Sequence, residues 1–185
     1  MKSKIVFLGE SSVGKTALIN RIVFDIFEEN LKPTISAAFK LKSMFFNGVE
    51  HEMQFWDTAG EEKFRSLAPI YVQNASLAVI VFDVTNEQSF NDLDLWIEVS
   101  QSSGKTPFIV LGNKNDLVNR VETSESFNNI IKEKYGAPYI DCSAKTGEGI
   151  DLVLQQALTI LDSQSQEIIL KEPAMQEKKK KEKCC

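Results

Sequence analysis

The chain has 185 residues, 43% of them hydrophobic, which is enough to bury the core of one globular domain. No stretch approaches the roughly 20 apolar residues of a membrane-spanning helix, and the first apolar run starts too early for a signal peptide, so we expect a cytosolic protein. The formal net charge is −5, and because the last fifteen residues carry +3, the rest of the chain carries −8. An acidic body argues against nucleic acid as a partner.

The first predicted elements are a strand, a loop and a helix. Residues 4–8 form an apolar run, residues 16–24 have helical spacing, and residues 9–16 read Gly-Glu-Ser-Ser-Val-Gly-Lys-Thr, the phosphate-binding pattern G-x-x-x-x-G-K-[ST]. In this pattern, successive backbone N–H groups and the helix N-terminus hold phosphate oxygens. Lys15 adds a cation for the β- and γ-phosphates, and Thr16 offers a hydroxyl to Mg²⁺. The loop therefore predicts a nucleotide site.

Two alternating segments follow, over residues 39–46 and 49–56, and the Asn-Gly pair between them predicts a β-hairpin. Apolar runs and helical spacing then alternate. The further predicted strands cover residues 77–82 and 108–111 and a short run from residue 139, and the predicted helices cover residues 88–101, 122–135 and 149–162.

This order of elements predicts a doubly wound α/β fold. Its sheet has six strands, mostly parallel, with helices on both faces and one antiparallel edge strand. In such sheets, ligands bind beyond the carboxyl ends of the strands. We interpret His51, the only histidine, as an ordinary surface residue of a strand, and Cys142 as a reduced core residue.

Polar motifs follow three of the predicted strands. Asp57 comes after the hairpin and can complete the Mg²⁺ shell opposite Thr16. Residues 113–116 read Asn-Lys-Asn-Asp, and a carboxylate at Asp116 can accept the N1 and N2 hydrogens of guanine. Adenine lacks that edge, so a buried unpaired carboxylate rejects it by several kcal/mol. Residues 143–145, Ser-Ala-Lys, can present a backbone N–H to the guanine O6.

Together these motifs resemble those of the Ras-like small GTPases, and the resemblance extends to about residue 162. It implies the P-loop NTPase fold of small GTPase type. Within that superfamily the chain is similar to the Rab family. The segments that carry this similarity are residues 35–39, 55–57, 63–67 and 71–75 and the Cys-Cys ending. Residues 37–39 and 66–69 are most similar to the early-endosomal branch.

The resemblance implies GTP or GDP as the ligand and Mg²⁺ as the metal. The implied nucleotide-binding residues are Ser11, Ser12, Val13, Gly14, Lys15, Thr16, Ala17, Phe27, Thr34, Gly60, Asn113, Lys114, Asp116, Ser143, Ala144 and Lys145. The implied metal ligands are Thr16, Thr34 and Asp57. Thr34 and Gly60 reach the γ-phosphate only in the GTP state, so loss of that phosphate releases two switch segments.

The chain departs from the family pattern at Glu61, where the family places Gln. That Gln orients the attacking water, because it accepts from water and donates to the γ-phosphate. An ionised Glu61 only accepts, and it brings a negative charge close to a polyphosphate. Either hydrolysis is impaired and the GTP state is long-lived, or the carboxylate assists the water as a base. With Lys15 as the second catalytic residue, we expect a slow GTPase.

Residues 163–185 are predicted to be a flexible basic tail that follows a GTP-binding domain over residues 1–162. The tail contains four consecutive lysines and ends in Cys184 and Cys185, and such cysteines are geranylgeranylated in Rabs. Two lipid chains anchor a protein stably, and lysines add roughly 1 kcal/mol each near an anionic leaflet. The resemblance thus implies the cytosol and the cytoplasmic face of intracellular membranes, with the early endosome as the expected compartment.

The leading interpretation is a monomeric guanine-nucleotide switch that hydrolyses GTP and regulates vesicle trafficking. Its implied partners are an exchange factor, a GAP that supplies an arginine, a GDP-dissociation inhibitor or escort protein, and effectors. Phe39, Trp56 and Tyr71 match the aromatic triad through which effectors sense the switch, although ordinary packing is the alternative. A second interpretation is a GTP-loaded, effector-recruiting module with impaired hydrolysis. A third, a P-loop kinase, does not explain residues 113–116, the triad or the tail.

Overall fold

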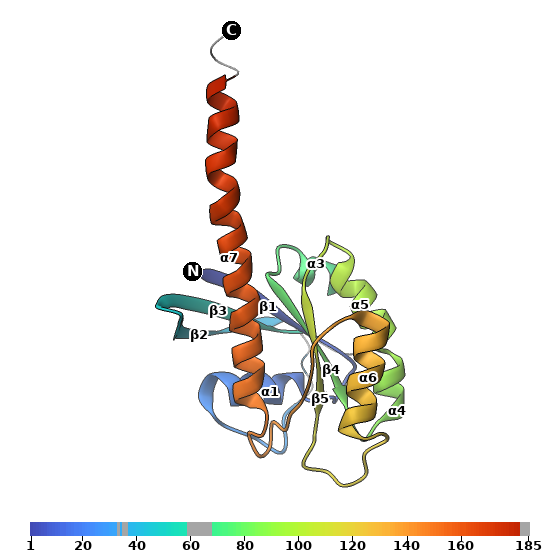
Figure 1. Ribbon diagram of the computed structural model, residues 1–185. Helices are drawn as coiled ribbons and strands as arrows, with labels where there is room; N and C mark the ends of the chain where they lie inside the picture. Colours follow the sequence, from blue (N-terminus) through green and yellow to red (C-terminus); the bar gives the residue numbers. More distant parts are fainter. Residues whose placement is uncertain (33, 35–36, 59–67, 182–185) are drawn as a thin grey trace.

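The computed structural model describes residues 1–32, 34, 37–58 and 68–181, with side chains as far as residue 165. Its centre is a six-stranded sheet in the order β2-β3-β1-β4-β5-β6 (Figure 1). The strands are β1 (Lys2–Leu8), β2 (Ala38–Phe46), β3 (Val49–Asp57), β4 (Leu77–Asp83), β5 (Phe108–Asn113) and β6 (Tyr139–Asp141). Neighbours are parallel except β2 and β3, which form an antiparallel hairpin at the edge. The predicted doubly wound fold is therefore confirmed.

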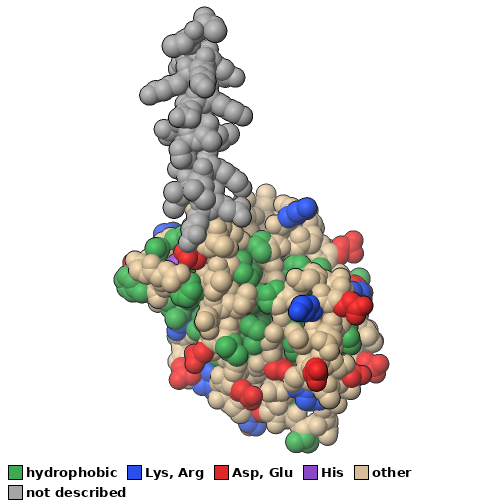
Figure 2. Space-filling view, viewed as in Figure 1, with side chains coloured by type: hydrophobic (Ala, Val, Ile, Leu, Met, Phe, Trp, Pro, Cys, Tyr) green, Lys and Arg blue, Asp and Glu red, His purple; other side chains and the backbone are tan. Residues whose placement is uncertain are grey.

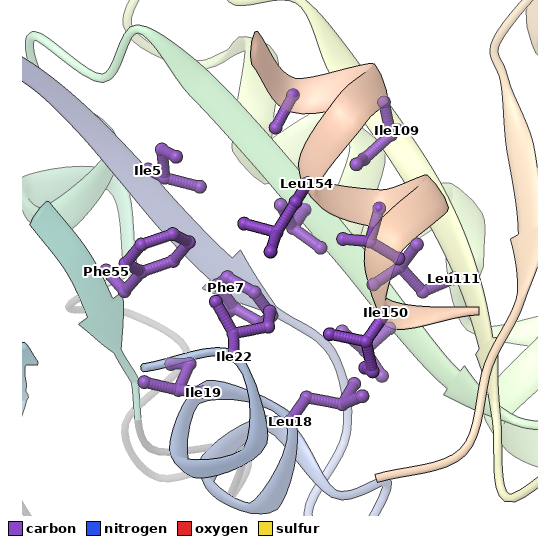
Figure 3. Close-up of a cluster of buried hydrophobic side chains, with 14 of the residues drawn as sticks. Ile5, Phe7, Leu18, Ile19, Ile22, Phe55, Ile109, Leu111, Ile150 and Leu154 are labelled. Carbon is purple, nitrogen blue, oxygen red and sulfur yellow. The ribbon is translucent and has the colours of Figure 1, made fainter. Parts of the chain in front are cut away.

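Helices cover the sheet on two faces (Figure 1). They are α1 (Lys15–Phe24), α3 (Ala68–Val72), α4 (Glu87–Asn91), α5 (Leu93–Gln101), α6 (Ser124–Tyr135) and α7 (Ile150–Lys181). On one face, Leu18 of α1 and Leu154 of α7 belong to one buried cluster with Phe7 of β1 (Figure 3). On the other face, α3, α5 and α6 surround a second cluster that contains Trp96 and Phe127. Both faces of β4 are covered, and all seven of its residues are buried, which explains its unbroken apolar run.

The helices differ in extent from those predicted. The predicted helix over residues 88–101 is divided into α4 and α5 at Asp92, whose backbone (φ −80, ψ 2) leaves helical geometry. The Oγ of Thr123 accepts from the backbone N–H of Ser126 at 3.2 Å and sets the start of α6. α7 continues to Lys181 instead of ending near residue 162, through a segment rich in the helix formers Gln, Glu and Lys. The division into a domain and a tail stays a prediction.

His51 is buried, so the prediction of a surface residue is wrong. Alternate residues of a strand point to the same face, and His51 shares the buried face of β3 with Met53 and Phe55. The ring of Phe46 packs edge-on against it, with 6.4 Å between the centroids. Neither ring nitrogen of His51 has a hydrogen-bond partner in the described part of the chain. The interpretation of Cys142 as a buried, reduced core residue is confirmed.

Candidate functional site: a two-lobed cleft at the sheet edge

The loops that follow β1, β5 and β6 meet at the carboxyl edge of the sheet, where β3 ends at Asp57. After β1, the chain turns through Ser12 (φ 63) and Gly14 (φ 97) and enters α1. Only glycine fits at residue 14, because a side chain there would collide with the amide of Asn113. This turn directs backbone N–H groups and the positive end of α1 into one hollow, which suits phosphate oxygens.

The ammonium group of Lys15 lies in this hollow and is held by backbone carbonyls. Nζ donates to the carbonyl oxygen of Gly9 at 2.8 Å and to that of Glu10 at 2.7 Å. Burial lowers the pKa of Lys15 to about 8, although the negative charges of Asp57 and Glu10 oppose the shift. Among the described residues no carboxylate is hydrogen-bonded to this buried cation, so it attracts anions strongly, and phosphate oxygens would raise its pKa again.

Three oxygen-bearing side chains meet beside Lys15. Thr16 Oγ1 donates to Asp57 Oδ2 at 2.8 Å, Thr34 Oγ1 donates to the same oxygen at 3.3 Å, and the two hydroxyls are 2.9 Å apart. The second carboxylate oxygen of Asp57 is buried without a partner in the described part of the chain. Burial raises the pKa of Asp57, while the hydrogen bond from Thr16 and the charge of Lys15 lower it.

This group fits the predicted Mg²⁺ site. Hydroxyl and carboxylate oxygens are hard ligands, and Mg²⁺ takes one or two carboxylates, with phosphates and water completing its shell. The orphaned oxygen of Asp57 is a donor that a cation would satisfy. Among the described residues there is no cluster of three or more His, Cys, Asp and Glu, so a metal held here would depend on the ligand's own phosphates.

The loop after β5 is fixed to the phosphate loop by Asn113. Its amide nitrogen donates to the carbonyl of Val13 at 2.8 Å, and its amide oxygen accepts from the backbone N–H of Ala144 at 3.1 Å. Both ends of this amide therefore join loops of the protein. Lys114 pairs with Asp83 at 2.6 Å, which holds the ammonium end of its chain in place.

Asp116 lies where the sequence predicts the carboxylate that reads the base. Ser143 Oγ donates to Asp116 Oδ1 at 2.6 Å. Oδ2 of Asp116 has no hydrogen bond within the described part of the chain. The arrangement thus leaves a carboxylate oxygen for the N–H groups of a ligand in the lobe between the loops after β5 and β6.

The described site residues line a cavity with two adjoining lobes of about 300 and 170 Å³. The larger lobe is lined by Ser11, Ser12, Gly14, Lys15, Thr16, Ala17, Phe27, Thr34 and Lys114. The smaller is lined by Phe27, Asn113, Lys114, Asp116, Ala144 and Lys145. Val13 and Ser143 are buried behind these walls. The larger lobe contains the Lys15 ammonium, which suits the phosphates of a nucleotide. The smaller lobe contains the Asp116 carboxylate, which suits the N–H groups of a purine.

Sequence reasoning missed two arginines whose hydrogen bonds join the loops around the smaller lobe, which we call the base lobe. Arg21 of α1 donates to the carbonyls of Ala144 and Lys145, each at 2.9 Å. Arg120 donates to Asp141 Oδ1 at 2.8 Å and to Asn115 Oδ1, and so joins the loop after β5 to β6. No local sequence pattern marks the longer-range pairs, because Arg21 is 123 or more residues from its partners and Arg120 is 21 residues from Asp141.

Sequence reasoning also missed several lining residues of the larger lobe, namely Glu28, Glu29, Leu31, Lys32 and Thr58. Most of them lie in the polar stretch that precedes Thr34. Because they precede Thr34, a predicted nucleotide-binding residue, their position in the sequence could have indicated that they line the site.

Two rings of the predicted aromatic triad, those of Phe39 and Trp56, are in direct contact. Phe39 stacks on Trp56, with 5.2 Å between ring centroids. Trp56 and Tyr71 are both partly buried and pack against the cluster under α3 and α5. Lys4 Nζ lies 4.5 Å from the centroid of the Trp56 ring. A role of these rings in partner recognition remains a prediction, since packing alone accounts for Trp56 and Tyr71.

Four predicted functional residues, Gly60, Glu61, Cys184 and Cys185, lie outside the described residues. Within the described part of the chain, none of the helices combines the length and the apolar composition needed to cross a bilayer.

Two comparisons with known proteins agree with this geometry. The sequence model of the Ras family matches residues 4–163 of the chain. The GTP-binding protein YPT53 of Saccharomyces cerevisiae (strain ATCC 204508 / S288c) is 43% identical over 162 residues, which cover 82% of this chain and 73% of the yeast protein.

Proposed function

Because the chain belongs to the Ras family of small GTPases and is of the Rab type, we propose that it is a switch that binds GTP and GDP with Mg²⁺, hydrolyses GTP and regulates vesicle trafficking. One observation carries the proposal. A single cavity has the Lys15 ammonium in one lobe and the Asp116 carboxylate in the other. Such a cavity matches a purine nucleotide that carries N–H donors on its base and anionic oxygens at its far end.

The residues divide the binding task between them. The Lys15 ammonium and the backbone N–H groups of residues 11–14 neutralise the phosphates, and burial keeps water from competing with them. Asp116 accepts the N–H groups of guanine, and adenine would leave it unpaired in a desolvated lobe. Mg²⁺, held by Thr16, Thr34 and Asp57, would supply charge that offsets the negative phosphates.

Switching follows from the position of Thr34. Its hydroxyl contacts Thr16 and Asp57 in the larger lobe of the cavity. Strand β2 begins four residues later, at Ala38. A γ-phosphate in this lobe would draw Thr34 toward the ligand, and its loss would release that contact. Asp57 follows Trp56, on which Phe39 stacks, so the contact of Thr34 with Asp57 links the site to the outer face of the hairpin.

Glu61 gives a specific reason to consider a second function, a GTP-loaded module that recruits effectors and turns over very slowly. A carboxylate close to the γ-phosphate repels it and cannot donate a hydrogen bond. Single-turnover hydrolysis by the wild type and by Glu61→Gln separates the two functions. A Gln variant at least tenfold faster supports the slow module. Equal rates support the ordinary switch, and no hydrolysis by either protein would contradict both an enzymatic role and the proposed effect of Glu61.

We further propose that the tail attaches the protein to endosomal membranes through prenylated Cys184 and Cys185. Two lipid chains give stable attachment where one gives only marginal binding. Cell fractionation of the Cys184→Ser/Cys185→Ser double variant should move the protein to the soluble fraction. Unchanged membrane association would contradict the anchor, and separation from endosomal markers in the wild type would contradict the compartment.

A further inference from the structure

The phosphate loop contains an acidic side chain near its start. Glu10 follows Gly9 directly, in a loop that suits phosphate oxygens. Over the face of the molecule in Figure 2, acidic and basic side chains are interspersed, and an acidic residue needs no special explanation there. In the phosphate loop it does, because a carboxylate repels the negative charges of phosphates at short range. Glu10 is not among the described residues that line either lobe of the cavity, so its carboxylate is directed elsewhere.

The Glu10 carboxylate contacts a tryptophan from a distant part of the chain. Nε1 of Trp96, in α5, donates to Oε1 of Glu10 at 3.1 Å, although the two residues are 86 positions apart. Trp96 is 1% exposed and belongs to the buried cluster that also contains Leu8, the last residue of β1. A buried indole N–H needs an acceptor, and a ring that is fixed by packing presents its N–H in one direction. Helix α5 therefore offers the loop a rigid hydrogen-bond donor.

The backbone of Glu10 is engaged as well. Its carbonyl oxygen accepts from Nζ of Lys15 at 2.7 Å, so one residue contacts α5 through its side chain and the Lys15 ammonium through its main chain. The other end of the loop has a similar link, because the amide of Asn113 donates to the carbonyl of Val13 at 2.8 Å. Side chains from outside the phosphate loop therefore hold it at both ends.

We propose that Trp96 is a positioning residue for the phosphate loop, and that its indole N–H keeps the Glu10 carbonyl directed at Lys15 by holding the Glu10 carboxylate. This inference rests on the proposed binding of a nucleotide in the cavity, and it adds a residue of the buried core to that function. With the indole donor removed, the carboxylate is less restrained, and its attraction to the Lys15 ammonium competes with the phosphates.

Two simpler explanations lead to different results. If Trp96 acts by packing alone, its loss loosens the loop whatever residue stands at position 10. If the charge of Glu10 acts by itself on the Lys15 ammonium, removal of the charge matters and the hydrogen bond does not. Glu10→Gln distinguishes the second explanation from the proposal, because the side-chain oxygen of glutamine is neutral and still accepts from an indole N–H.

The dissociation rate of a fluorescent GDP from the full chain tests the positioning role. Trp96→Phe removes the donor and Glu10→Ala removes the acceptor, and each should speed dissociation about tenfold through the loss of a hydrogen bond to a charged group. The double variant should be no faster than either single variant. Glu10→Gln should stay within about threefold of the wild type, because it keeps a weaker form of the bond. The control Tyr135→Phe, which removes a hydroxyl that donates to Asp94 of α5 at 2.8 Å, should leave the rate unchanged.

An NMR correlation spectrum of the indole N–H groups tests the contact itself. The chain has two tryptophans, so two indole peaks are expected, and the loss of one peak in Trp56→Phe assigns both. Glu10→Ala should move the Trp96 peak upfield, because its proton loses a charged acceptor. The Trp56 peak should stay in place, since its N–H faces Gln54 at 3.4 Å. If Trp96→Phe does not fold, this spectrum and the two Glu10 variants decide the question.

Three results would overturn the inference. They are a Trp96 peak that Glu10→Ala does not move, an equal effect of Trp96→Phe in the wild type and in the Glu10→Ala background, and a Glu10→Gln protein that releases GDP as fast as Glu10→Ala. GDP binding by the wild type with unchanged rates in the variants refutes the positioning role and spares the switch. A wild type that binds no GDP refutes the proposed function and this role with it, while the NMR peaks still report the contact between Trp96 and Glu10.

Discussion

The two halves of the sheet differ in what covers them. β1, β4 and β5 lie between two layers of helices, and the loops after β1, β5 and β6 are joined by hydrogen bonds such as those of Asn113 and Arg120. Among the described residues, β2 and β3 are covered by helices on one face only, and Phe39 and Phe45 are exposed on the other. We propose that the covered half holds the ligand in its cavity, while the half-covered hairpin offers a surface to other molecules.

This difference is consistent with the proposed combination of nucleotide binding and signalling in one small domain. A fixed cavity needs loops that cannot separate, and the loops after β1 and β5 are linked across the site by Asn113. A signalling surface must respond to a small change, and Thr34 connects the cavity to β3 through the contact of its hydroxyl with the carboxylate of Asp57. The predictions below disturb one half and leave the other unchanged.

Removing the cation from the covered half has the largest expected effect. Lys15→Ala should weaken GDP at least about 100-fold, because charge-assisted hydrogen bonds contribute roughly 1.5–3 kcal/mol each. Isothermal calorimetry measures the loss. The matched control is Lys2→Ala on the hairpin side, whose ammonium is exposed and pairs with Glu52, and it should bind GDP like the wild type. A Lys15→Ala protein with wild-type affinity would mean that the ligand's phosphates lie elsewhere.

The second largest effect is expected from removing the link that Arg120 makes between the loop after β5 and β6. Arg120→Ala should raise the dissociation rate of a fluorescent GDP about tenfold, because Asp141 and Asn115 lose a partly buried partner worth roughly 1–2 kcal/mol. Lys134→Ala breaks the exposed pair with Asp94 and serves as the control with an unchanged rate. An equal rate in Arg120→Ala would show that the two loops do not need this link.

A change of pH tests the charge state of Lys15. In the free site its pKa is lowered to about 8, so it is protonated below pH 8 and loses its proton above. Phosphate oxygens would raise that pKa in the complex, so GDP affinity should fall above pH 8 by up to about tenfold per pH unit. Calorimetry in buffers of different ionisation enthalpy should detect proton uptake on binding at pH 9. Binding without proton uptake, or uptake that persists in Lys15→Ala, would contradict the assignment.

The smallest effect concerns His51 beneath the hairpin. His51→Leu replaces a buried imidazole, whose nitrogens have no hydrogen-bond partner among the described residues, by an apolar side chain of similar volume. It should raise the free energy of unfolding by about 1–2 kcal/mol and Tm by about 2–4 °C, measured at saturating GDP. Affinity for GDP should not change, because His51 lies away from the cavity lining. A lower Tm would mean that the imidazole has a partner that stabilises it.

Much of the fold and of the site follows from sequence. The phosphate loop, the Asn-Gly hairpin and the buried strand β4 depend on local chemistry, and the loop, Asp57 and Asp116 were placed correctly at strand ends. The burial of His51 was missed because a single polar residue in an alternating strand was assigned to the exposed face. The pairing of Arg120 with Asp141 was missed because tertiary contacts between distant residues leave no periodic pattern. The length of α7 was missed because its charged segment lacks an apolar stripe.

The most direct test is calorimetry of the full chain with Mg²⁺ and either GDP or ADP. The cavity described here predicts one GDP bound per chain and no measurable heat with ADP, since adenine has neither a hydrogen on N1 nor an amino group at C2 for Asp116 to accept. Replacement of Asp116 by Ala should reduce this preference. Equal affinity for the two nucleotides, or no heat with GDP, would contradict the assignment of the cavity to a guanine nucleotide.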